Sequence, residues 1–165
     1  MAKHQSTLEK ELQKWLCTAK RIVVAGIGNP IRSDDSVGTK IIQELQGKTS
    51  AKINLLECET VPESFIDEIA SFEPTHVLLI DAAFMGLRPG EVRLINTEKM
   101  TGFPAISTHM LPLPVFCELI AQLTGAKIAL ILIEPKSTEM GEGLTAEVQG
   151  SAEILVRFLL KSFPK

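Results

Sequence analysis

The stretch AGIGNPIRSDDSVG, residues 25–38, decides how this sequence folds. It follows the apolar residues 22–24, which predict a buried strand, and apolar residues at helical spacing continue to Leu45. A strand, a glycine turn and a helix open an α/β unit. A phosphate-binding loop would present glycines and a helix N-terminus to an anion. This turn instead delivers two carboxylates, Asp34 and Asp35.

The glycines of this turn predict close backbone packing. Gly26 and Gly28 permit conformations and approaches that a side chain would block, and Gly38 lets the helix approach the sheet. We expect Asp34 to cap the helix. Asp35, in the first turn, either complements the helix dipole or faces a ligand.

The rest of the chain alternates between helical and strand patterns. Helices are predicted over residues 9–19, 34–45, 62–71, 113–123 and 145–160. Strands are predicted over residues 22–26, 53–56, 76–80, 91–95 and 127–133. The strand at 91–95 follows Asp81 too closely for a crossover helix, so we expect it to be antiparallel. The prediction is α/β, a three-layer sandwich with a parallel-rich twisted sheet, one antiparallel edge strand and helices on both faces.

Composition limits the function. The 165 residues suffice for one domain, predicted over residues 1–165. A net charge of -3 argues against nucleic acid, which needs clustered basic residues. No apolar stretch is long enough for membrane insertion, and the charged first residues lack a signal-peptide core, so we expect a cytoplasmic protein. Three widely spaced cysteines predict buried free thiols.

Three polar features fall where open α/β sheets bind ligands, at the carboxyl ends of strands. They are Asp35, Asp81 directly after residues 77–80, and His109 before the predicted helix 113–123. Two carboxylates and an imidazole suit a divalent metal of borderline softness. Asp81 could instead cap a turn.

The other polar candidates have simpler interpretations. His76, inside an apolar strand, is expected to be structural, and His4 is expected to lie in a frayed terminus. The loop at 134–143 follows the last strand and could line the same cleft, although a plain surface loop is the favoured interpretation.

Three motifs together resemble the hydrogenase maturation endopeptidases. GIGNPIRSDDSVG at 26–38 resembles the N-terminal signature of that family. PTHVLLIDAAFMGLRPGEVRLI at 74–95 and STHMLPL at 107–113 are similar to motifs of its HycI branch, which serves hydrogenase 3-type enzymes. The resemblance extends from about residue 22 to about residue 150.

The resemblance implies a site and a reaction. The metal ligands of the family fall on Asp35, Asp81 and His109, and Asp35 and Asp81 are the implied catalytic residues. The implied activity is removal of the C-terminal extension of a nickel-iron hydrogenase large-subunit precursor after nickel insertion. The precursor presents the nickel, and other divalent metals could occupy the site. We expect a monomer, with the metal either activating the scissile bond or only positioning the substrate.

Two departures and two alternatives stay open. Residues 57–60, Glu-Cys-Glu-Thr, replace the Asp-Gly-Gly type turn often found after the second strand of the family, and the segment before Arg21 extends beyond the usual start. Peptidyl-tRNA hydrolases share a G-x-G-N-P turn, but a catalytic histidine follows theirs and residues 32–35 follow this one. The other alternative is a non-catalytic module that checks the nickel loading of a partner.

Overall fold

The computed structural model describes residues 2–99, 106–107 and 112–165. Its helices are α1 (Ala2–Leu16), α2 (Val37–Leu45), α3 (Ile66–Ser71), α4 (Leu113–Thr124) and α5 (Ala146–Ser162), with 3-10 turns η1 (Ser33–Ser36), η2 (Pro62–Phe65) and η3 (Thr97–Lys99). Its strands are β1 (Ile22–Ile27), β2 (Ile53–Glu59), β3 (His76–Phe84), β4 (Val92–Asn96), β5 (Ile106–Ser107) and β6 (Lys127–Ile133).

The main sheet has the strand order β2-β1-β3-β6-β4. β1 is parallel to β2 and β3, and β3 is parallel to β6. β4 pairs antiparallel with β6 at the edge, which confirms the predicted antiparallel edge strand. The short β5 pairs antiparallel with the end of β3.

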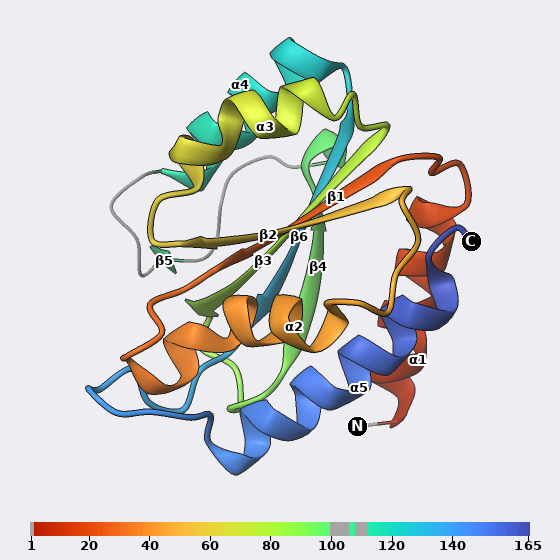
Figure 1. The fold of residues 1–165 in the computed structure, drawn as a ribbon. Coiled ribbons are helices and arrows are strands. Elements are labelled where there is room, and N and C mark those ends of the chain that lie inside the picture. The colour runs from red at the N-terminus through yellow and green to blue at the C-terminus, as the bar shows by residue number, and fades with distance from the viewer. Residues whose placement is uncertain (1, 100–105, 108–111) are drawn as a thin grey trace.

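Helices cover both faces of the sheet, so the predicted three-layer α/β architecture is confirmed (Figure 1). α1, α2 and α5 lie on one face, where Ile22, Val24, Leu78 and Ile80 point. α3 and α4 lie on the other, over the alternate residues of the same strands. The inner strands β1 and β3 are buried along almost their whole length, because both their faces are covered.

Most predicted elements are present, with shifted ends. α1 begins at Ala2 and not near residue 9, and the hydroxyls of Ser6 and Thr7 donate hydrogen bonds to the Lys3 carbonyl. The helices predicted from residues 34 and 62 each open with a 3-10 turn. α4 ends as predicted before Gly125, whose φ of 69° closes the helix in the left-handed conformation.

β3 is longer than predicted. The strand was expected to end at residue 80, but it continues through Asp81 to Phe84. The extension pairs with β6 at Ala82 and with β5 at Ala83 and Phe84. Among the described residues, no helix is long and apolar enough to cross a membrane.

Candidate active site at the carboxyl edge of the sheet

The turn after β1 holds Asp35 by direct backbone contact. A Cβ atom on Gly28 would stand 1.9 Å from the carbonyl oxygen of Asp35, and Gly28 has a φ of 154°. Only glycine fits this approach. The Asn29 amide donates to Oδ2 of Asp35 at 3.0 Å, and the Asp35 amide donates to the Arg32 carbonyl. The turn therefore orients the Asp35 side chain and backbone, and Asp35 is only 3% exposed.

Gly38 brings α2 onto the sheet as predicted. A Cβ atom here would lie 2.3 Å from the carbonyl oxygens of both Ile27 and Ile80. The first turn of α2 therefore rests on the ends of β1 and β3. Because η1 immediately precedes α2, this contact also fixes the position of η1 at the carboxyl edge of the sheet.

Asp81 lies in β3 beside the point where the sheet topology reverses. The chain runs from β1 outward to β2 and then returns to β3 on the other side of β1. Pairing between β1 and β3 ends at Gly26 and Ile80, so Asp81 is the first residue past it. Ligands of open α/β sheets bind at such a switch point. Asp81 is fully buried, and its strand continues past it to Phe84, so Asp81 does not mark the end of the strand as expected.

Asp34 does not cap a helix, contrary to the prediction. Neither η1 nor α2 has a side-chain capping bond. The fully buried Asp34 carboxylate accepts hydrogen bonds from the amides of Lys136, Ser137 and Thr145 and from the Thr145 hydroxyl. Thr145 stands at the N-cap position of α5, yet its hydroxyl bonds to Asp34 and not to its own helix.

The loop after β6 is more than the plain surface loop favoured from sequence. Its backbone is joined to η1 through Asp34 and through an isolated bridge between Arg32 and Gly141. Glu134, at its start, is 5% exposed and accepts a 2.6 Å hydrogen bond from the Met85 amide. Glu134 was given no separate role from sequence. The sequence pattern that could have identified Glu134 is the same as at Asp81, an acidic residue directly after an apolar run.

The third predicted ligand, His109, lies outside the described residues. The described chain approaches it from β5, where Ser107 pairs with Ala83, two residues beyond Asp81. Within residues 2–99, 106–107 and 112–165, no group of three or more His, Cys, Asp or Glu side chains could hold a metal. The predicted site combines Asp35 and Asp81 with His109, and it stays a prediction.

The other histidines lie away from this edge. His76, buried at the start of β3, has its ring 4.8 Å from that of Trp15 in a T-shaped contact. Burial, followed by the charge of Lys127, lowers the pKa of His76. This confirms the structural role predicted for it. His4, which was expected in a frayed terminus, is an exposed residue in the first turn of α1.

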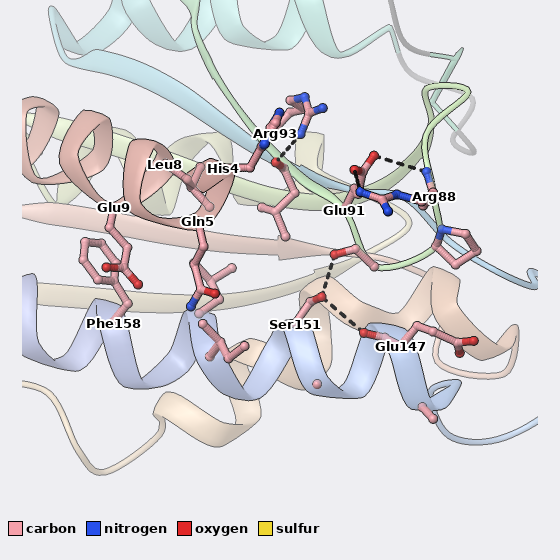
Figure 2. Close-up of a pocket in the computed structure, with 17 residues that line it drawn as sticks. His4, Gln5, Leu8, Glu9, Arg88, Glu91, Arg93, Glu147, Ser151 and Phe158 are labelled. Atoms are coloured by element: carbon pink, nitrogen blue, oxygen red, sulfur yellow. Dashed lines mark hydrogen bonds and ion pairs between the residues drawn. The ribbon is translucent and has the colours of Figure 1, made fainter. Parts of the chain in front are cut away.

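A cavity of about 610 Å³ lies elsewhere, between α1, the start of β4 and α5 (Figure 2). Arg88 and Glu91 at its rim pair with each other at 3.2 Å, and the Ser151 hydroxyl donates a hydrogen bond to the Gly90 carbonyl. Hydrogen bonds from the Arg88 amide and then from the Arg88 side chain lower the pKa of Glu91. Asp81 alternates with residues of the α1–α5 face, so this cavity lies across the sheet from it.

The two buried cysteines are poor candidates for a nucleophile. Burial raises the pKa of Cys58 and of Cys117 to about 12, with the charges of Glu68 and Glu63 adding to the effect at Cys58. Both are therefore thiols at neutral pH, and a thiol is a poor nucleophile. They are buried as predicted, whereas Cys17 is exposed.

The fold and this edge define a three-layer α/β protein with buried acids at the switch point of its sheet. The sequence profile of the HycI hydrogenase maturation protease family matches residues 39–162. The chain belongs to this hydrogenase maturation protease family.

Relatives agree in sequence and structure. The crystal structure of the nickel-iron hydrogenase maturation protease HycI from Thermococcus kodakarensis superposes with a TM-score of 0.84 at 32% identity, covering 92% of this chain and 97% of that one. The hydrogenase maturation protease HybD from the same organism superposes with a TM-score of 0.70 at 25% identity, covering 86% of this chain and 97% of that one. The hydrogenase 3 maturation protease of Escherichia coli K12 is 24% identical over 137 residues, 83% of this chain and 87% of that protein.

Proposed function

We propose that this protein is an endopeptidase that removes the C-terminal extension of a nickel-loaded nickel-iron hydrogenase large-subunit precursor. Family membership supports the hydrogenase maturation role. The observation that carries the site is the pair of buried carboxylates at the switch point, Asp35 in η1 after β1 and Asp81 in β3.

In this proposal nickel belongs to the substrate. Asp35, Asp81 and His109 are the groups that contact it, since carboxylate oxygens and an imidazole nitrogen suit that metal. Other divalent ions would fit the same donors. His109 enters on the sequence pattern and on the pairing of Ser107 with Ala83 in β3.

The proposed cleavage is metal-assisted hydrolysis, in which water adds across the scissile C–N bond to leave a carboxylate and an amine. Asp35 and Asp81 would hold the precursor's nickel beside this bond, where a metal polarises a carbonyl or activates water. In the other form of the proposal, the metal only positions the precursor. The raised pKa of Cys58 and of Cys117 is consistent with a mechanism that uses no protein thiolate.

A protein substrate also suits the rim of this edge. Ile31 after β1, Val61 after β2, Phe84 at the end of β3 and Met140 after β6 are large apolar residues that are exposed. Ile31 and Met140 lie beside the bridge between Arg32 and Gly141. Apolar side chains gathered at one edge favour a polypeptide partner over a small polar molecule.

We further propose that the reaction is cytoplasmic and that residues 1–165 act as one monomeric peptidase domain. The three cysteines are free, as expected for a reducing compartment. The apolar faces of the sheet are covered by the chain's own helices, so neither face requires a second copy.

The test is cleavage of a large-subunit precursor, prepared with and without nickel and analysed by mass spectrometry. The proposal predicts loss of one discrete C-terminal peptide from the nickel-loaded form alone. Binding of the loaded precursor without a mass change would favour the loading-check module. Equal cleavage of both forms would refute nickel recognition while keeping the protease.

A further inference from the structure

Asp34 is a buried acid whose donors all come from one distant loop. Its Oδ2 accepts from the Lys136 amide at 2.8 Å and the Ser137 amide at 3.1 Å, and its Oδ1 accepts from the Thr145 amide at 2.7 Å. The Thr145 hydroxyl contacts both oxygens, at 3.0 and 2.8 Å. Hydrogen bonds to a charged acceptor are among the stronger ones.

The backbone of the same segment reinforces this attachment. The Asp34 amide donates to the Ser137 carbonyl at 3.1 Å, and the Ser33 amide donates to the Gly141 carbonyl at 2.9 Å. The Ser33 hydroxyl donates to the Glu139 carbonyl, and the Gly141 amide donates to the Ile31 carbonyl. Residues 31–34 and 136–145 therefore form one hydrogen-bonded unit, which we call the Asp34 clamp.

The clamp holds an unfavourable backbone conformation. Ser33 has a φ of 45°, in the left-handed region that residues with a Cβ atom rarely adopt. Such a conformation persists only where surrounding contacts over-determine it. Ser33 immediately precedes the Asp34-Asp35 pair, so releasing the clamp would let this part of η1 relax.

Asp35 is consequently held from two sides. Gly28 packs against its carbonyl, and the clamp fixes the residue before it. We infer that Asp34 is a positioning residue, which sets the location of the Asp35 carboxylate by clamping η1 to the loop after β6. This inference rests on the proposed function, in which Asp35 contacts the precursor's nickel.

Two substitutions weaken the clamp to different degrees. Asp34→Asn keeps the shape but replaces one acceptor oxygen with an amide group that faces amide donors. Thr145→Val removes only the hydroxyl contact and keeps the Thr145 amide bond. Thr145→Ser should restore the hydroxyl. Should Asp34→Asn fail to fold, Thr145→Val still tests the inference.

The matched control is Thr75→Val at the opposite edge of the sheet. The Thr75 hydroxyl also organises a loop, accepting from the Lys20 and Arg21 amides and donating to the Arg21 carbonyl. Thr75→Val makes the same chemical change as Thr145→Val and is also expected to lower stability. Thr75, however, lies at the amino end of β3, away from Asp35. It separates loss of stability from loss of positioning.

The measurements are single-turnover cleavage of the nickel-loaded precursor and amide hydrogen exchange. A catalytic group misplaced by about 1 Å can lose on the order of a hundredfold in rate. We expect the rate of Asp34→Asn at saturating precursor to fall by about that factor, and that of Thr145→Val by about tenfold. Thr145→Ser and Thr75→Val should cleave at the wild-type rate. The Asp35 amide, which bonds to the Arg32 carbonyl in its own turn and not to residues 136–145, should exchange faster in both clamp variants.

The outcomes separate the inference from the proposed function. A wild-type cleavage rate in folded Asp34→Asn and Thr145→Val would overturn the positioning role, as would equal rate losses in Thr145→Val and Thr75→Val. If the wild-type protein cleaves nothing, the proposed function fails. Exchange at the Asp35 amide then decides the inference, and unchanged exchange would refute it.

Discussion

At the amino edge of the sheet, His76 is buried against Trp15 and within 3.1 Å of the Thr75 hydroxyl. At the carboxyl edge, Asp34, Asp35 and Asp81 are buried instead. An imidazole with a lowered pKa can be buried as a neutral ring, whereas an ionised carboxylate needs donors or a cation. The chain supplies donors from a distant loop to the Asp34 carboxylate, and the Asn29 amide to the Asp35 carboxylate. The comparison teaches that the amino edge buries a ring that is stable without charge, whereas the carboxyl edge buries acids and supplies hydrogen-bond donors to them.

The largest effect is expected for Asp81→Asn. The change keeps the size of the side chain but removes the charge proposed to face nickel. We expect cleavage of the loaded precursor to slow on the order of a thousandfold, about 4 kcal/mol of activation free energy. Mass spectrometry over time gives the rate, and circular dichroism verifies the fold. Full cleavage by a folded Asp81→Asn protein would remove Asp81 from the mechanism.

Gly28→Ala is expected to lower stability and activity together. Its Cβ atom would overlap the Asp35 carbonyl, and we expect the free energy of unfolding to fall by about 3 kcal/mol. The matched control is Gly125→Ala, where φ is 69° and no atom lies within 4 Å of the new Cβ. Gly125→Ala should lower the free energy of unfolding by roughly 1 kcal/mol and cleave the precursor at the wild-type rate. Equal losses in urea titrations of both variants would contradict the close contact at Gly28.

The apolar rim is expected to affect recognition more than chemistry. The double substitution Ile31→Ser and Met140→Ser removes exposed side chains beside the proposed site. We expect KM for the precursor to rise about tenfold, worth about 1.4 kcal/mol, with little change in kcat. Leu123→Ser is the control, because Leu123 is also exposed but lies near the end of α4, away from the carboxyl edge. A similar rise in KM for Leu123→Ser would contradict the proposal that the apolar residues at the carboxyl edge recognise the precursor.

The smallest effect concerns stability at the amino edge. Burial, with Lys127 nearby, lowers the pKa of His76, while Glu98 opposes this. The unfolded chain therefore binds more protons than the folded one once the pH falls below about 6.5, and stability declines there. His76→Gln should flatten this decline without altering cleavage. Chemical denaturation across roughly pH 5 to 8 measures it, and an unchanged slope would contradict the assignment.

The sequence predicted the architecture because the inner strands are continuous apolar runs between helical patterns. Asp35 and Asp81 were selected from the sequence because each acid comes after an apolar run, and both are buried in the structure, while their role as ligands stays a prediction. The role of Asp34 could not be predicted, because its donors lie 102 and more positions along the chain. The extension of β3 depends on pairing with β5 and β6, which local patterns do not show. The prediction for His109 stays untested, because it lies outside the described residues.

The most direct test of the central claim is X-ray absorption at nickel in the loaded precursor, alone and bound to Asp34→Asn, Asp35→Asn and wild-type protein under conditions that trap the complex. If the carboxyl edge binds the precursor's nickel, the wild-type complex should add oxygen and nitrogen ligands to the metal. Asp35→Asn should lose the added carboxylate ligand. A nickel spectrum unchanged by binding, with cleavage intact, would contradict the claim that this edge recognises the metal.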